Sequence, residues 1–599
     1  MSTTTWIYLM LGIYCVYAFY WGLKGFFTEK TSAGYAIGGR SVPFIAFLMA
    51  ATAASFSGWT FIGHPGLIWR DGLAYAFASF YVLTIPITGT FFAKRQWLLG
   101  KRYNFITPGD MYAYYYNSEG MRWLVVLTAF LYSLFYSAVQ IMAAAALFYW
   151  TAGVPVVWGA IIMAFICWFY VCTGGMKAGA WVGVAQFVLL VGGIIMLGFY
   201  VITLPEFGGW SGFSAAVADL AKNPETKKLL EVPEVITWGL GKKGYASWTA
   251  VMCLTYMFAL MGIQSSPAFT MNFFGIKSPK VLPWQQAFMS TFVVGFALFY
   301  FTAFQGMGAK VLEMKGILKF TKDSDVVPIL MKTYLPGPAL ALVFLGAVAA
   351  IHSTAAPYIN TGGSILMRDI YWRLIRKQNA SQAEQIWGNR ILATVVTAAA
   401  VYTGLSSKAA LVILGALATA FGFVMYVPLL GVCWGFKFPR IGAVLGVAAG
   451  MIGVALTYKV WPNPLSMHCA FWGLFAGLVV AYLCRGLGMK DDEETLKRQA
   501  ELRSWLDSVD EPSESGKKWR GVMKPVTLLW YFFAIGPACI LGNTAFSFAG
   551  YPPLWSWQIA WWIAGIVMMW ALCFKAELSV STDAQIERAN KELASVVKD

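Results

Sequence analysis

The stretch AATAASFSGWTFIGHPG, residues 50–66, interrupts an apolar segment with hydroxyl side chains, glycines and a proline. A second stretch of this kind, ALMGIQSSPAFTMNFFG at 259–275, places a polar triplet directly before Pro267. In lipid, backbone polar groups need internal partners, so a broken helix is tolerated only where it is buried in protein or lines a cavity. Both stretches therefore predict discontinuous helices that meet at a binding site near mid-membrane. Each stretch alone would also fit the alternative of a glycine-packed helix contact with a proline kink.

The composition around these stretches is typical of a polytopic membrane protein. Of the 599 residues, 59% are hydrophobic and 12% are charged, whereas a soluble chain carries roughly 25% charged residues. The mean hydropathy is +0.62. We therefore predict an all-α membrane protein. About 15 apolar runs are long enough to cross a bilayer as helices, near 5–26, 41–68, 72–93, 122–150, 154–172, 178–203, 249–275, 284–309, 336–367, 390–406, 409–436, 440–459, 467–484, 525–546 and 554–574.

The broken helices open two consecutive blocks of five predicted helices, about 41–203 and 249–436. Breaks at matching positions indicate a five-plus-five inverted repeat. The expected domains are an extra N-terminal helix at 1–34, a ten-helix core at 35–436, two peripheral helices at 437–485, a linker at 486–522, a C-terminal helix pair at 523–575 and a tail at 576–599. The first half of the linker has helical spacing, and the composition of its second half is typical of disorder.

The net charge of +16 does not indicate a nucleic-acid partner, because the cations cluster in alternate loops. Short loops such as 151–153 and 544–553 are nearly free of Lys and Arg, so the positive-inside rule places them outside. The predicted topology is a multi-pass protein of the plasma (inner) membrane with its N-terminus outside and its C-terminus in the cytoplasm. The expected partners are a small-molecule solute and the lipid bilayer, and the linker at 486–522 is a candidate docking segment for a cytoplasmic partner.

The predicted helices contain almost no charged side chain away from their ends, which disfavours a proton relay built on buried carboxylates. A membrane enzyme built on His64, His352 and His468 would need a nucleophile or an acid in one site with them, and no carboxylate accompanies them in the membrane. We therefore expect no enzyme. For His352, a satisfied packing role competes with substrate contact or pH sensing.

Three further stretches occur in order along the chain: YAIGGRSVP at 35–43, GGMKAGAWVGVAQ at 174–186 and STAAPYINTGGSILMRDIY at 353–371. Together with the first broken helix they resemble the sodium:solute symporter family, over about residues 35–375 with a reasonable continuation to 485. The resemblance implies a LeuT-like fold and transport of a solute coupled to sodium.

The resemblance also implies a sodium site. It falls on the hydroxyls of Ser353 and Thr354, and on the backbone carbonyls of Ala350, Ala53 and Phe56. Sodium is a hard cation that prefers oxygen ligands, and hydroxyls plus carbonyls freed at a helix break supply them without fixed charge. The alternative is that both hydroxyls bond only to their own helix. Sodium is the expected coupling ion, with no other cofactor.

The chain departs from the family pattern at several positions. Ser55 and Gly183 stand where related transporters carry acidic residues, which favours coupling to one sodium ion. Ala259, Ile263 and Asn272 replace the Trp, Tyr and Arg around the proline pocket of the sodium/proline symporter. These replacements argue against proline as the substrate.

The predicted solute pocket contains no charged side chain. Its expected residues are Ser55, Ser57, Gly58, Trp59, Gln140, Tyr256, Gln264, Ser265, Ser266, Pro267 and His352. The positive N-terminal ends of half-helices can still hold a carboxylate. We therefore predict a sodium-coupled symporter that imports a small organic acid or amino acid by alternating access. The alternatives are a transporter-fold sensor, or a proton-coupled or uncoupled carrier of the same solutes.

Overall fold

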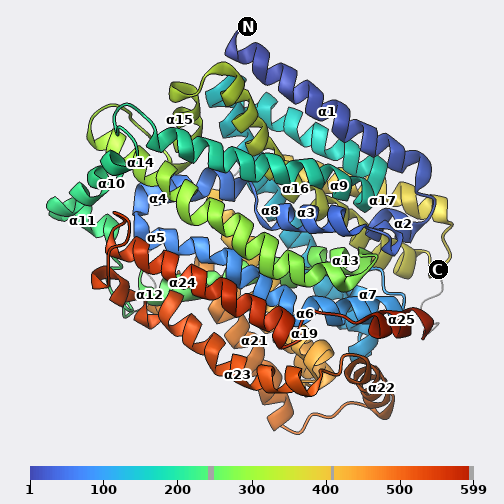
Figure 1. Ribbon diagram of the computed structural model, residues 1–599. Helices are drawn as coiled ribbons and strands as arrows, with labels where there is room; N and C mark the ends of the chain where they lie inside the picture. Colours follow the sequence, from blue (N-terminus) through green and yellow to red (C-terminus); the bar gives the residue numbers. More distant parts are fainter. Residues whose placement is uncertain (240–247, 407–410, 593–599) are drawn as a thin grey trace.

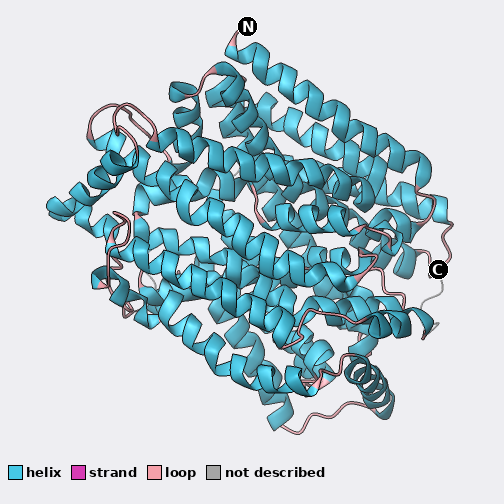
Figure 2. Cartoon of the chain, viewed as in Figure 1, coloured by secondary structure: helices cyan, strands magenta, loops and turns pink. Residues whose placement is uncertain are grey.

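The computed structural model describes residues 1–239, 248–406 and 411–592, and this part of the chain is helical with no strand (Figures 1 and 2). The predicted tail therefore lies outside the described residues from 593 onward, and the predicted helix 409–436 is described from 411. Helix α1 lies along one edge of the bundle and α23 along the opposite edge (Figure 1).

The helices fall into three consecutive groups. The first comprises α1 (Thr3–Thr28), α2 (Ser32–Ile37), α3 (Phe44–Ser55), η2 (Trp59–Gly63), α4 (His64–Asp71), α5 (Leu73–Ala76), α6 (Tyr81–Arg102), α7 (Pro108–Tyr116), α8 (Glu119–Ala152), α9 (Val156–Ile202), α10 (Trp210–Asp219) and α11 (Pro224–Lys227). The second comprises α12 (Ala250–Ser265), α13 (Pro267–Gly275), η7 (Trp284–Val294), η8 (Ala297–Thr302), α14 (Ala303–Met314), α15 (Val326–Tyr334), α16 (Gly337–Ile365), η10 (Leu366–Ile375), α17 (Gln382–Ser406), α18 (Leu411–Val424) and α19 (Tyr426–Trp434). The third comprises α20 (Arg440–Lys459), α21 (Cys469–Gly486), α22 (Glu493–Val509), α23 (Glu514–Trp530), η12 (Tyr531–Ile535), η13 (Pro537–Thr544), α24 (Pro553–Trp570), η14 (Ala571–Lys575) and α25 (Asp583–Lys591).

Both predicted helix breaks are present. The first broken helix bends by 51° between α3 and η2, and the second bends by 44° between α12 and α13. Proline has no backbone N–H, so Pro267 cannot continue the hydrogen bonding of α12. Ser266 takes an extended conformation at this point, and its Oγ donates to the carbonyl of Ile263 at 2.7 Å. The serine thereby satisfies a carbonyl that the break leaves free.

The first half of the first broken helix is joined to the second half of the second broken helix. The N–H of Val42, just before α3, donates to the carbonyl of Gly275 at 3.1 Å, and the N–H of Lys277 donates to the carbonyl of Val42 at 3.0 Å. These bonds tie the start of α3 to the end of α13.

Among the described residues, ten helices are long and apolar enough to cross a membrane, or up to 13 if each of three bent pairs is one span. The 47-residue α9 covers the two predicted helices 154–172 and 178–203, and its backbone leaves the helical conformation at Gly175 (φ 63°, ψ −156°). An unbroken helix of this length would measure about 70 Å, more than twice a hydrocarbon core of about 30 Å. The count of about 15 stays a prediction.

The linker differs from its prediction. Residues 514–522, expected to be disordered, form the start of α23, which continues to Trp530. That prediction is wrong because the linker is anchored to the core. Asp510 lies 2.6 Å from both Lys94 Nζ and Arg95 Nε of α6, and all three side chains are buried. A polar composition predicts disorder only where no partner satisfies it.

Helix α16 lies at the centre of the core and packs against α9, α8, α17 and α1 (Figure 1). The first half of the first broken helix, α3, packs on α9 and also on α16. This packing brings residues 50–56 and 350–354 together.

Candidate functional site

The hydroxyl of Ser353 joins two helices at the predicted sodium site. Its Oγ lies 3.1 Å from the carbonyl of Ala53 in α3 and 3.1 Å from the carbonyl of Ala350 in α16. Thr354 Oγ1 lies 3.3 Å from the same Ala350 carbonyl. Phe56, the residue directly after α3, donates its N–H to the Ala53 carbonyl at 3.1 Å.

The residues of the predicted sodium site therefore meet around the backbone carbonyls of Ala53 and Ala350. Thr354 bonds within its own helix, as the alternative proposed, whereas Ser353 also bonds across to α3. Buried hydroxyl and carbonyl oxygens from two helices are the ligand types that a hard monovalent cation requires. The helix break matters because it ends the hydrogen bonding of α3 beside these carbonyls.

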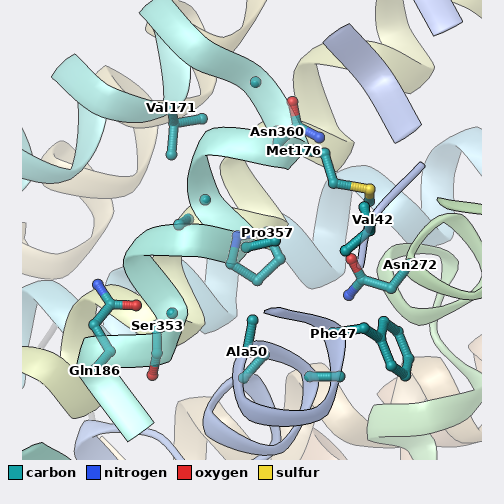
Figure 3. Close-up of a pocket in the computed structure, with 17 residues that line it drawn as sticks. Val42, Phe47, Ala50, Val171, Met176, Gln186, Asn272, Ser353, Pro357 and Asn360 are labelled. Atoms are coloured by element: carbon teal, nitrogen blue, oxygen red, sulfur yellow. The ribbon is translucent and has the colours of Figure 1, made fainter. Parts of the chain in front are cut away.

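A cavity adjoins this site between α3, α9, α13 and α16 (Figure 3). The space open to the centre of a water molecule is about 50 Å³. Its polar lining comes from Gln186, Asn272, Ser353 and Asn360. It extends toward Met176, next to Lys177, and thus toward the end of the core that carries the loops predicted to be cytoplasmic.

The solute residues predicted on the first broken helix lie against α8. Gln140 Oε1 accepts from the N–H of Gly58 at 2.9 Å, at the break itself. Ser57 Oγ accepts from the N–H of Trp59 at 3.2 Å, while Ser55 Oγ donates to the carbonyl of Ala51 in its own helix. The break is thus held open by side chains rather than by helix hydrogen bonds.

The side chains of the solute residues predicted on the second broken helix contact several different elements. Ser265 Oγ donates to the carbonyl of Gly422 in α18 at 2.8 Å. Gln264 faces α6, because a Cβ at Gly89 would lie 2.1 Å from its Oε1. The ring of Tyr256 contacts Trp248 and His468. Gln264 and Tyr256 therefore contact elements other than the Ser353 region, and Pro267 is buried at the break.

His352 points toward α1 and α9. Its Nε2 lies 3.0 Å from the Met163 carbonyl, which can only accept, so Nε2 carries the hydrogen. Its Nδ1 then accepts from the hydroxyl of Tyr14 at 2.9 Å, and that hydroxyl accepts from Gln186 Nε2 at 2.7 Å. Both ring nitrogens have partners, which is the arrangement of a packing histidine.

Sequence reasoning missed an aromatic cluster beside the two breaks. The rings of Tyr132, Tyr136 and Tyr358 lie with centroids 4.9–5.4 Å apart, and Ala268 packs against them. Tyr132 and Tyr136 are four residues apart, so they share one face of α8. That spacing was the available signal, but the contact with α16 depends on the tertiary fold.

A second missed cluster consists of buried charges at the ends of α8 and η10. Arg122 bonds to Asp110 at 3.0 Å and also to Asp369, and all three side chains are at most 5% exposed. The sequence shows these charges near helix ends, where exposure is the ordinary expectation. Their mutual pairing explains their burial.

A helical membrane bundle with two discontinuous helices, one of them beside a group of buried oxygen atoms, defines a secondary transporter of the LeuT-like fold. The chain belongs to the sodium:solute symporter family, whose model matches residues 35–450. The predicted family and fold class are confirmed. The chain is a sodium-coupled solute importer of the membrane, and its family is one of transporters rather than enzymes.

Similar proteins agree with this assignment. The sodium/proline symporters of Staphylococcus aureus strains JH9 and JH1 are each 26% identical over 502 residues, covering 78% of this chain and 88% of theirs. A solved structure of a Na⁺-coupled sialic acid symporter, in a substrate-bound outward-open state, matches with a TM-score of 0.68 and 17% identity. It covers 80% of this chain and 98% of its own, and at this identity it shows the fold.

Proposed function

We propose that this chain imports a small organic acid or amino acid together with one sodium ion, across the plasma membrane and with its N-terminus outside. The observation that carries the ion site is the Ser353 hydroxyl between the carbonyls of Ala53 and Ala350. In this proposal the ion is bound by those two carbonyls, the Phe56 carbonyl and the hydroxyls of Ser353 and Thr354.

The proposed coupling follows from where these ligands lie. Ala53 belongs to the first broken helix and Ser353 belongs to α16, so an ion bound by both joins the two elements. A ligand shifts a conformational equilibrium only by its differential affinity for the two states. Sodium then favours the state in which α3 and α16 are close and the outward pocket is formed.

The proposed solute class rests on the charge and shape of the pocket. Ser57, Gly58 and Gln140 surround the first break, and none is charged. A carboxylate is held there by the positive end of a half-helix, such as α13 beginning at Pro267. Tyr136 and Tyr358 supply an aromatic wall for the remainder of the solute.

The first test measures the thermal stability of the purified protein in sodium, potassium or choline chloride, with a panel of small carboxylates and amino acids. We expect sodium alone among the cations to raise the melting temperature, and one compound to raise it further. A ligand at 100 times its Kd stabilises the folded state by about 2.7 kcal/mol. The absence of a sodium response would contradict the proposal.

The second test substitutes the ligands. Ser353→Ala and Thr354→Ala each remove one oxygen ligand, so we expect about tenfold more sodium to be needed for the stability shift. Thr397→Ala is the matched control, because the Thr397 hydroxyl is buried in α17 and also bonds to the carbonyl four residues earlier. Equal sodium dependence in all three variants would refute the site.

A further inference from the structure

A groove runs between α24 and the helix that comprises η7, η8 and α14, two elements that lie side by side (Figure 1). Its volume is about 440 Å³, within the range of about 300–1,000 Å³ that ligand pockets occupy. The side chains that line it are all aliphatic or aromatic, and most come from two runs: Ala287, Phe288 and Phe292 of η7, and Ile566, Val567 and Trp570 of α24.

Contacts between the two helices bound the groove at both ends. At one end, Trp562 Nε1 of α24 donates to the carbonyl of Thr291 at 2.8 Å. At the other end, the rings of Trp284 and Phe574 meet edge to face with centroids 5.8 Å apart. The lining of α24 runs over 566–574, so the groove is about 12 Å long, close to half of a hydrocarbon core of about 30 Å. Its length therefore matches one leaflet of a bilayer.

Two tryptophans and a lysine lie at the end of the groove near Phe574. Tryptophan is enriched at the membrane–water interface, and the side chains of Trp284 and Trp570 are 49% and 46% exposed. The Nζ of Lys575 lies 5.3 Å from the centroid of the Trp570 ring. Lys575 is exposed and pairs with no carboxylate within the described part of the chain. This end of the groove therefore presents a positive charge at the level of lipid head groups.

A second cation lies at the same end. Lys280 precedes Trp284 by four residues, so both side chains lie on one face of the helix. The Nζ of Lys280 is 2.5 Å from Asp583, but the pair is exposed, at 49% for the lysine and 88% for the aspartate, and such a pair contributes little. Glu577, the acidic residue next to Lys575 in sequence, accepts from Ser513 Oγ at 2.5 Å. The two lysines are thus available to a further anion.

We propose that this groove binds one membrane phospholipid with an anionic head group. One acyl chain lies between η7 and α24, where the aromatic rings supply dispersion contacts along its length. The head group contacts Lys575 and Lys280, which the predicted topology places on the cytoplasmic side, and basic pockets between membrane helices on this side select anionic lipids. The lipid thereby joins the C-terminal helix α24 to the ten-helix core. The inference does not depend on the sodium site.

The test compares two lipids with identical acyl chains, the anionic phosphatidylglycerol and the zwitterionic phosphatidylcholine. Each is titrated into the delipidated full-length protein, and native mass spectrometry gives the dissociation constant of the first bound lipid. We expect phosphatidylglycerol to bind at least fivefold more tightly. Lys575→Gln is expected to weaken phosphatidylglycerol about fivefold, the effect of one lysine near the surface, and to leave phosphatidylcholine unchanged.

The chain offers a matched control for this charge in Lys24 of α1. Its Nζ lies 4.6 Å from the centroid of the Trp21 ring, and its side chain is also exposed on the predicted cytoplasmic side. Lys24→Gln therefore removes an equivalent charge away from the groove, and we expect its affinity for phosphatidylglycerol to equal that of the unmodified protein. Lys575→Arg keeps the charge and is expected to keep the preference.

Filling the groove tests the acyl chain separately from the head group. The side chain of Val567 is 62% exposed and lines the groove, so we expect Val567→Trp to weaken both lipids at least tenfold. Ile563 lies one turn earlier on α24, is 52% exposed and does not line the groove. Ile563→Trp is therefore expected to leave both affinities unchanged.

Equal affinity of the unmodified protein for the two lipids would overturn this inference, and so would unchanged phosphatidylglycerol binding in both Lys575→Gln and Val567→Trp. A dimer that Val567→Trp dissociates, with lipid binding unchanged, would show that a second copy of the chain covers the groove. None of the substituted residues belongs to the proposed sodium site. The sodium response is therefore expected to persist in every variant, and its absence would contradict the proposed function alone.

Discussion

Gly183 and Gly179 lie one turn apart on α9, yet only one of them allows a close helix contact. A Cβ at Gly183 would collide with Ala50, whereas a Cβ at Gly179 would meet nothing within 4 Å. The sequence shows two similar glycines, and only the position of α3 distinguishes them. The glycine at position 183, where related transporters carry an acidic residue, thus removes a negative charge and also lets α3 approach α9.

At this residue scale we predict that Gly183→Ala destabilises the protein by about 1–3 kcal/mol, because the added methyl forces α3 away from α9. Gly179→Ala is expected to stabilise by about 0.5–1 kcal/mol, since it only restricts the unfolded chain. Thermal unfolding in one detergent compares the two variants. A loss of stability in Gly179→Ala equal to that in Gly183→Ala would show that the contact with Ala50 is irrelevant.

At the scale of elements, the linker helix α22 is held to the core by buried charge. Asp510, just after α22, pairs with Lys94 and Arg95 in the second half of α6, and the guanidinium of Arg95 also stacks on the ring of Trp434 at 3.9 Å. Removing one partner of a buried pair leaves the others uncompensated. The helix α22 agrees with the helical spacing of the first half of the linker, whereas the order at the start of α23 was not predicted from composition.

We predict that Asp510→Asn costs about 3–5 kcal/mol and exposes residues 490–515 to protease. Glu494→Gln is the control, because the Glu494 side chain of α22 is 63% exposed and pairs with Arg498 one turn along the same helix, where an ion pair contributes at most about 1 kcal/mol. Limited proteolysis followed by mass spectrometry locates the cleavage. Protection of the linker in both variants would rule out this anchor.

At the scale of the whole molecule, the predicted topology places the linker in the cytoplasm and the loop 204–248 outside. Eight of the nine native cysteines are buried, so they should react little with a membrane-impermeant thiol reagent. In intact cells we expect Ser211→Cys to be labelled and Ser515→Cys to be labelled only after the membrane is opened, because both positions are exposed. The reverse pattern would invert the topology.

Much of the fold was predictable because membrane burial makes local signals strong. Apolar length predicts spans, and Pro267 and the glycines of 50–66 mark the breaks, because lipid does not tolerate unsatisfied backbone. The assignment of Ser353 and Thr354 as sodium ligands came from resemblance to the family and stays a proposal. The contacts of Gln264 with α6 and of Tyr256 with Trp248 and His468 could not be predicted, because the direction of a side chain around a buried helix depends on its neighbours.

The sequence by itself determined an all-helical membrane transporter with two broken helices and an uncharged interior, since these properties follow from composition and from residues that cannot continue a helix. Only the tertiary structure decided that Ser353 reaches Ala53 and that Gly183 lets α3 approach α9. The physical reason is that these contacts join residues more than a hundred positions apart in the chain. Their geometry depends on how whole helices pack, which no local pattern encodes.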